Sequence, residues 1–288
     1  VSIRIYEMAI LHLANIFFEW ELETGCKLEL KKSFYLHPNF LQLQFLPLLF
    51  AHHKDGVAVT HFPPPSYIKS LERLGFNLPS IHLIDEPPTC YDRIESWGWS
   101  HIVAKWANLK GLMYTPPSFR IIKTHASKEF AFSCSPNLPG AKILHHLEEL
   151  MQWLREWPYP KVLKKCYAFS GRGNFILKHP DCFSKIKANI IKTFSKGHVL
   201  IGEPWVKRTA DFSTQWELKK SLSPNYLGAL VMNNTKSGCF NSILSERIEQ
   251  LTPFLEQHLE AVKPTLKHLL ETHYYGNLGI DAMVYVNP

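Results

Sequence analysis

The segment KKCYAFSGRGN, residues 164 to 174, combines residue types that can bind phosphate groups. Gly171 and Gly173 can adopt positive φ without a Cβ clash, so that backbone N–H groups nearby converge on an anion. Lys164 precedes them on a predicted strand and adds a positive charge at its end. The spacing matches neither a Walker A loop nor the dinucleotide-binding GxGxxG loop. By itself the segment favours an ordinary β-turn over a phosphate-binding loop.

The composition is that of a globular protein with a positive charge. The 288 residues are 45% hydrophobic and 20% charged, which is typical of folded domains, and this length allows two domains or one domain built in lobes. A formal net charge of +7 indicates an anionic partner. Lysines and arginines are scattered along the sequence without a long basic run, so we do not expect a nucleic-acid partner.

Cysteine spacing and apolar stretches bear on the cellular location. The six cysteines have irregular gaps and include no CxxC pair, which excludes the usual spacing of a zinc site. Scattered thiols and the lack of a signal peptide favour a reducing cytoplasm. The most apolar stretch, residues 40–51, contains two glutamines and a proline, and it is typical of a buried strand or the start of a helix rather than a membrane span.

The N-terminal part alternates between strand and helix patterns. Strands are predicted at residues 56–62 and 80–85, which are rich in β-branched and apolar side chains. Between them YIKSLERLG predicts a helix that Ser66 can cap and Gly75 can end. This order predicts a parallel α/β layer. Residues 89–109 are expected to be helical, and a domain boundary is expected in Lys105–Pro117.

The C-terminal part has a different pattern. Residues 119–132 look extended, and a turn and an amphipathic helix follow, with an apolar stripe from Ile143 to Leu154. His145 and His146 are placed on the flank of this helix. A long helix begins at Thr252, where a proline follows a capping residue. Strands are predicted at residues 160–169, 175–179, 198–206, 211–218, 226–233 and 278–286.

The order of these elements resembles that of the ATP-grasp superfamily. The motifs THASKEF, LPGAKIL, FSGRGN, EPWVKRTADFSTQ and YYGNLGIDAMVY look like those of uncharacterised bacterial ATP-grasp proteins, over about residues 119–288. The resemblance implies a Rossmann-like pre-ATP-grasp domain at residues 1–110, a first ATP-grasp lobe with a phosphate loop at 111–200, and an incomplete second lobe at 201–288. The implied fold class is therefore α/β followed by α+β.

The resemblance also implies roles for single residues. Arg208 would neutralise a transferring phosphate or a substrate carboxylate, and Asp281 would hold Mg²⁺ against the phosphates. The residues implied to contact ATP are the lysines Lys128 and Lys164, the loop residues Ser170, Gly171, Arg172, Gly173 and Asn174, the hinge residues Glu203, Pro204 and Trp205, and the acid Asp211.

The activity that the resemblance implies is an ATP-dependent ligase. ATP would phosphorylate a small carboxylate, and an amine, or less expectedly a thiol, would attack the acyl phosphate. The sequence departs from the superfamily pattern because it ends at Pro288 without the Glu-x-Asn pair of the second metal site. This departure indicates a truncated chain or a degenerate protein. Two alternatives therefore stay open, a non-catalytic relative that binds nucleotide or a partner protein, and a basic nucleic-acid-binding protein.

Overall fold

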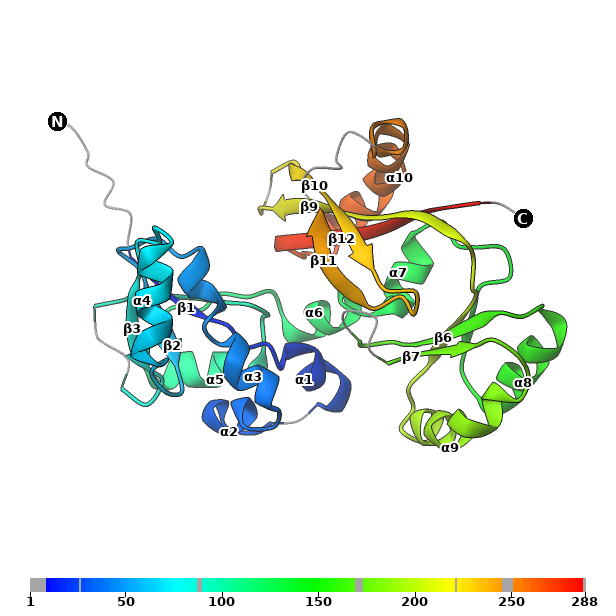
Figure 1. Ribbon diagram of the computed structural model, residues 1–288, viewed down its shortest axis with the longest axis horizontal. Helices are drawn as coiled ribbons and strands as arrows, with labels where there is room; N and C mark the ends of the chain where they lie inside the picture. The colour runs from blue at the N-terminus through cyan, green and yellow to red at the C-terminus, as the bar shows by residue number, and fades with distance from the viewer. Residues whose placement is uncertain are drawn as a thin grey trace. The chain divides into compact units, whose positions relative to one another are not determined.

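A computed structural model describes residues 9–25, 27–86, 90–168, 173–220, 222–244 and 251–286. The chain divides into two compact units, residues 1–119 and 120–288, which are coloured from blue to green and from green to red in Figure 1. In the described residues no helix has the length and apolar character needed to cross a membrane. The predicted division of the second unit into two lobes near residue 200 stays a prediction.

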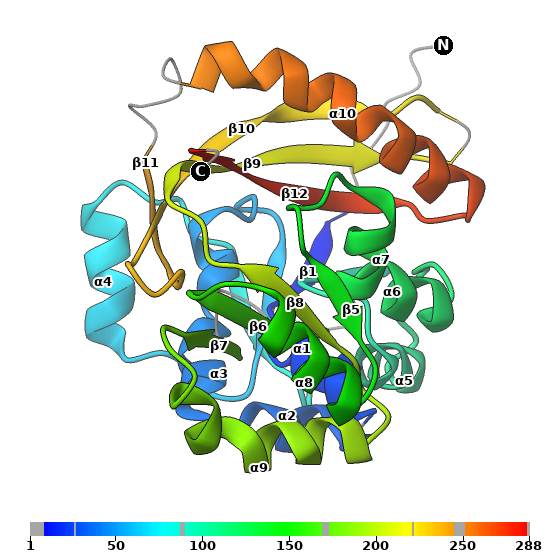
Figure 2. The ribbon, with the colours of Figure 1, turned by 90° about the vertical axis from the view of Figure 1, so that its right-hand side faces the viewer.

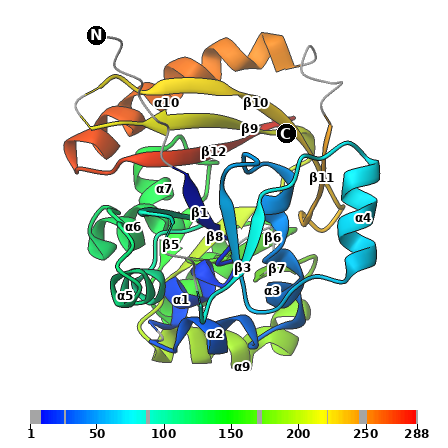
Figure 3. The ribbon, with the colours of Figure 1, turned by 90° about the vertical axis from the view of Figure 1, so that its left-hand side faces the viewer.

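The first unit is built on a parallel sheet with the strand order β3-β2-β1-β4. Leu11, Leu13 and Ala58 point to one face, where they form a core with buried aromatic and aliphatic side chains from the helices. Val57 and Val59 point to the other face and pack against a smaller apolar cluster. Figure 3 shows this sheet and its helices. The elements are β1 (Ile10–Leu13), α1 (Phe18–Thr24), α2 (Leu30–Phe34), α3 (Pro38–Leu43), η1 (Leu46–Leu49), β2 (Gly56–Val59), α4 (Pro65–Arg73), β3 (Ser80–Leu83), β4 (Arg93–Ser96) and α5 (His101–Leu109).

The predicted parallel α/β layer is confirmed, with two local corrections. Ser66 does not cap α4, because the helix begins at Pro65 with Pro64 as its N-cap and no side-chain cap; a proline at the first position already has a helical φ. Residues 89–109 are not one helix, because RIES forms strand β4 and pairs with β1. The stretch at 40–51 is helical, in α3 and η1.

The second unit contains two antiparallel sheets. The first has the order β5-β8-β6-β7, and its Leu144, Leu163, Leu177 and Leu200 pack with α8 and α9. The second has the order β11-β10-β9-β12 and packs against α10. Figure 2 shows both sheets with their helices. The elements are α6 (Phe119–His125), α7 (Lys128–Cys134), β5 (Lys142–Leu144), α8 (Leu147–Glu156), β6 (Lys161–Lys165), β7 (Asn174–Leu177), α9 (Cys182–Ser195), β8 (Leu200–Pro204), β9 (Arg208–Leu218), β10 (Asn225–Asn234), β11 (Phe240–Leu244), α10 (Thr252–Glu271) and β12 (Gly276–Tyr285).

The six strands predicted in this unit and the long helix from Thr252 are confirmed, but the N-cap of this helix is Leu251 rather than Thr252. Two other segments differ from the prediction. Residues 119–132 are not extended but form α6 and most of α7. The Ser127 hydroxyl accepts a hydrogen bond from the Phe130 N–H at 3.0 Å, which caps α7. Ile143 and Leu144 belong to strand β5 rather than to the following helix. His145 and His146 therefore precede α8, and His146 is its N-cap.

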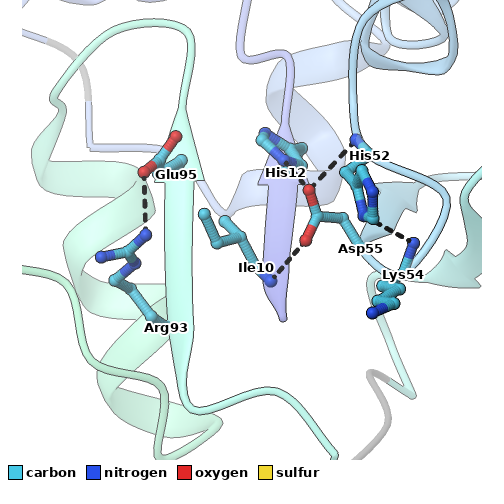
Figure 4. Close-up of polar contacts among 7 residues, drawn as sticks. All are labelled: Ile10, His12, His52, Lys54, Asp55, Arg93 and Glu95. Carbon is cyan, nitrogen blue, oxygen red and sulfur yellow. Dashed lines mark hydrogen bonds and ion pairs between the residues drawn. The ribbon is translucent and has the colours of Figure 1, made fainter. Parts of the chain in front are cut away.

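A polar cluster lies on the first unit's sheet, around Asp55 (Figure 4). The Asp55 carboxylate accepts hydrogen bonds from the Ile10 N–H at 3.0 Å and the His52 N–H at 3.2 Å, and His12 Nε2 lies 3.1 Å away. Burial raises the pKa of this carboxyl, but the three hydrogen bonds together outweigh it and hold the pKa below its ordinary value. Asp55 thereby joins the start of β1 to the loop before β2.

Replacing Asp55 by asparagine is expected to lower the free energy of unfolding of the first unit by about 1–3 kcal/mol at pH 7. The carboxylate's contribution is present above its unfolded pKa of 3.8 and is lost as the pH falls through the lower folded value. Urea denaturation at pH 7 and pH 3 should therefore show the difference between parent and Asp55→Asn shrinking in acid. The exposed neighbour His53, changed to asparagine, is the control. A difference that stays constant with pH would contradict this role.

Candidate functional site

Lys164 lies on the face of its sheet that points away from α8 and α9. It is on β6 opposite Asn174 of β7, and its neighbour Leu163 points into the core beneath the helices. Its ammonium nitrogen is 2.5 Å from Oε2 of Glu203, which comes from the adjacent strand β8. Both side chains are mostly buried, at 26% and 18% exposure. A lysine and a glutamate predicted to contact nucleotide are thus brought together by the pairing of β6 with β8.

The loop that joins β6 to β7 carries the predicted phosphate site. Ser170, Gly171 and Arg172 lie outside the described residues. Gly173 has a φ of +86°, which glycine adopts without strain. Oδ1 of Asn174 is buried and has no hydrogen-bond partner among the described residues. A buried acceptor without a donor is costly, so Asn174 is suited to receive a hydrogen bond from a ligand or from water.

Replacing Gly173 by alanine is expected to lower the stability of the second unit by about 1–3 kcal/mol, because the positive φ is strained for a residue with a Cβ. A Cβ there would also meet Cβ of Ala168 at 3.2 Å. Thermal unfolding should show a lower midpoint than for Gly197→Ala, since Gly197 has a φ of +71° but open space around it. Equal midpoints would mean that the contact with Ala168 has no energetic weight.

Lys128 lies where the chain enters this loop, although it is not on a strand as predicted. It is the first residue of α7, and its backbone N–H donates to the Cys166 carbonyl at 3.0 Å. Its ammonium group donates to the Ala168 carbonyl at 2.6 Å. Lys128 therefore contacts the segment that leads into the glycine loop, whereas Lys164 lies on the strand before that segment and contacts Glu203.

The segment between β8 and β9 holds Trp205 and Arg208 in a stacked arrangement. Pro204 is the last residue of β8, and the Trp205 N–H donates to the Pro160 carbonyl at 2.9 Å. The Arg208 guanidinium lies 4.8 Å from the centre of the Trp205 ring and forms an ion pair with Asp211 at 3.2 Å. Stacking and charge pairing together fix the direction of the guanidinium.

The sequence analysis missed Gly238, which lies against the same tryptophan. A Cβ at this position would come within 2.8 Å of the Trp205 ring. Gly238 is in the turn between β10 and β11, with a φ of +74°. The turn signal TKSG was present at residues 235–238, but nothing in the sequence indicates which side chain the turn packs on.

Asp281 lies on the face of the second sheet that is turned away from α10. It pairs with Ser213 of β9, while Asp211 pairs with Met283. The alternating residues Thr214 and Phe212 instead contact His258 on α10. Asp211 and Asp281 are therefore diagonal neighbours on one face, a spacing of about 7–8 Å between backbones. In the described part of the chain, no three side chains of the metal-binding types come together.

A hollow of about 760 Å³ between α7 and α10 contains none of the predicted site residues. Helices α7 and α10 are joined there by a hydrogen bond of 2.7 Å from the Thr265 hydroxyl to the Cys134 carbonyl. Burial raises the pKa of the Cys134 thiol, so the thiol is protonated at neutral pH. The hollow is lined by Thr124, Ser127, Glu129, Phe130, Ser133, Cys134, Tyr167, Pro264, Thr265 and His268.

Solved structures with a similar fold are nucleotide-bound synthetases and carboxylases. N5-carboxyaminoimidazole synthetase from Staphylococcus aureus, complexed with ADP, is 12% identical with a TM-score of 0.53, over 98% of this chain and 69% of that one. The biotin carboxylase domain of the 2-oxoglutarate carboxylase from Hydrogenobacter thermophilus, in complex with MgADP, ADP and bicarbonate, is 16% identical with a TM-score of 0.57, over 96% and 60%.

Biotin carboxylase from Campylobacter jejuni, in a β-γ-ATP complex, is 13% identical with a TM-score of 0.54, over 96% of this chain and 62% of that one. The chain thus spans 60 to 69% of the length of these three proteins. No protein-family model matches the sequence. At such low identities the likeness shows the fold alone.

Proposed function

Since the chain has the ATP-grasp fold, we propose that it is an ATP-dependent ligase that joins a small carboxylate to an amine. A carboxylate oxygen would attack the terminal phosphorus of ATP, and ADP would leave. The amine would then attack the acyl carbon and release phosphate. A thiol could replace the amine in the second step. Such chemistry needs positioning and charge neutralisation rather than a side-chain nucleophile.

The observation that carries the proposal is the meeting of Lys164, Glu203 and Asn174 at the base of the glycine loop. Lys164 and Glu203 form a mostly buried ion pair, and the buried Asn174 acceptor next to them has no partner in the described residues. An ammonium group beside an open acceptor suits a nucleotide, which offers phosphate oxygens to the first and donors to the second. Lys128, whose ammonium group donates to the Ala168 carbonyl just before the loop, would add a second positive charge.

Mg²⁺ fits the carboxylates Asp281 and Asp211, which lie on one face of the second sheet. Carboxylate oxygens are its preferred protein ligands, and one or two of them with phosphate oxygens are enough. When bound, the ion would neutralise phosphate charge as it transfers. Arg208, which Asp211 and Trp205 hold in place, would stabilise the same charge or bind the substrate carboxylate.

A second candidate function is nucleotide binding without turnover. It is favoured by the ion pair of 3.2 Å between Asp211 and Arg208, because a carboxylate that is paired with a guanidinium attracts a metal ion less strongly. Such a protein would bind nucleotide or a partner protein without hydrolysing ATP.

Two measurements on the purified protein test both candidates. ATP with Mg²⁺ should raise the thermal midpoint, by an amount that grows with ligand concentration. ADP release should then depend on added pools of small carboxylates and amines. A raised midpoint without ADP release would favour binding without turnover. An unchanged midpoint at millimolar ATP would contradict both candidates.

A further inference from the structure

Helix α9 carries a row of lysines on its outer side. Lys185, Lys187, Lys192 and Lys196 are all exposed. None of the four forms an ion pair with a described residue, whereas Lys263 and Lys267 on α10 are paired with glutamates. Figure 2 shows α9 along the outside of the sheet β5-β8-β6-β7. Within the described structure, the carboxylate at the start of this helix, Asp181, pairs with His179 rather than with one of these lysines.

The helix fixes the direction of these lysines. Phe183, Ile186 and Ile190 face the core beneath α9, together with side chains from α8 and the sheet. Lys185, Lys192 and Lys196 follow one another at i, i+7 and i+11, so they form a stripe along one flank of the helix, about 16 Å long at 1.5 Å per residue. Since the apolar stripe is buried, the lysines cannot turn inward. Lys187 lies on the other flank.

The charge is concentrated in this short segment. Residues 178–196 contain five lysines and one aspartate, which give +4 of the chain's formal +7. Read along the sequence these lysines are scattered, but helical folding brings most of them to one surface. A positive surface of this kind attracts a polyanion, and the attraction depends on ionic strength.

The chemistry of the surface distinguishes among polyanions. Protein interfaces are depleted in lysine and need apolar or aromatic anchors, and membrane insertion needs several exposed apolar side chains. The outer side of α9 offers one such residue, Ile191, at 44% exposure. The exposed cationic side chains of α9 are all lysines, and lysine suits phosphate contacts that carry no sequence information.

We propose that the outer face of α9 binds the phosphate backbone of nucleic acid without sequence preference. The stripe of about 16 Å would follow roughly five base pairs of a duplex. This surface is separate from the proposed nucleotide site, because Lys164 and Glu203 lie on the opposite face of the same sheet. The proposal therefore does not depend on the ligase activity.

Fluorescence anisotropy with a labelled 30-base-pair DNA duplex of arbitrary sequence tests this inference. With three phosphate contacts from the stripe, the affinity should fall roughly 40-fold between 50 and 200 mM salt. Lys185→Gln/Lys192→Gln should weaken binding roughly tenfold or more and reduce the salt dependence to about a third. Lys263→Gln/Lys267→Gln on α10 removes the same charge and should change the affinity by less than about threefold. Lys164→Met should bind the duplex like the parent.

Three results would overturn the proposal. Equal losses in the two double variants would show that net charge alone attracts the duplex. A polyglutamate peptide that binds as tightly as the duplex would indicate an acidic protein partner. Tighter binding to phosphatidylserine vesicles than to the duplex, lost in Ile191→Ser, would indicate a membrane surface.

Discussion

Replacing Lys164 by methionine is expected to weaken ATP binding by roughly 10- to 100-fold. The methionine keeps the apolar stem but removes the ammonium group, and a charge-assisted hydrogen bond contributes about 1.5–3 kcal/mol. The variant also leaves Glu203 without its ion-pair partner, which places an uncompensated negative charge beside the phosphates. Isothermal titration with ATP and Mg²⁺ measures the change directly, and the thermal shift with ATP should shrink in parallel.

Two controls sharpen this experiment. Lys142→Met changes an exposed lysine of β5, opposite Gly202, and should leave ATP affinity unaltered. The double variant Lys164→Met/Glu203→Gln should recover part of the lost affinity, because it removes the unpaired carboxylate. Parent-like ATP affinity in Lys164→Met would mean that this lysine is a structural ion-pair partner and nothing more, and the proposed nucleotide site would then be wrong.

Replacing Lys161 by alanine is expected to lower the free energy of unfolding of the second unit by about 3–5 kcal/mol. Lys161 is fully buried, and its ammonium group donates to the carbonyls of Trp153 and Leu154 at the end of α8. The group also lies 4.4 Å from the centre of the Tyr159 ring. Lys161→Met keeps most of the volume and should cost about 1–3 kcal/mol, which separates packing from hydrogen bonding.

Lys161 should also affect how the stability of the second unit depends on pH. Burial lowers the pKa of Lys161 from its ordinary value of 10.5, so the unfolded chain binds more protons than the folded one between the two values. Stability should therefore rise as the pH increases through this alkaline window, and Lys161→Met should abolish that rise. The exposed Lys178→Met is the control in urea denaturation. If Lys161→Met were as stable as the parent, the two hydrogen bonds would make no net contribution.

Strong local patterns predicted most of the strands. In β9 and β12 polar and apolar residues alternate, because one face contacts α10 and the other does not. For such long segments with turns at both ends, the sequence therefore predicted a strand correctly. The long helix α10 was equally clear, since a proline in its first turn precedes a sustained apolar stripe.

The errors arose where local patterns were ambiguous. Residues 119–132 contain β-branched and aromatic side chains that are typical of strands, yet the Ser127 cap and the packing of Phe130 against α10 make them helical. Ile143 and Leu144 continue an apolar stripe, but they pair with β8, so that α8 begins after them. In both cases a long-range contact, of Phe130 with α10 or of β5 with β8, contributes to the structure, and no short window of sequence contains it.

The candidate site was predicted only as a set of residue types. The sequence did not indicate that Lys164 would meet Glu203, because that contact depends on the register of β6 against β8. Nor did it indicate that the glycine turn after β10 would lie on Trp205. The motifs indicated which residues belong to the candidate site. Which of these residues contact one another depends on the pairing of the strands.

The stacked Trp205 has a mechanical consequence. The chain enters the sheet β5-β8-β6-β7 through residues 135–141 and leaves it towards β9 through residues 205–207. Within the second crossing, the Trp205 amide is tied to Pro160 and its ring to Arg208. Rotation of one sheet against the other would therefore change the backbone dihedrals of Val206 and Lys207, and it would strain the hydrogen bond of 3.1 Å from the Val286 N–H to the Lys207 carbonyl. A Lys207→Pro substitution would fix φ at this position and so restrict the orientation of the two sheets.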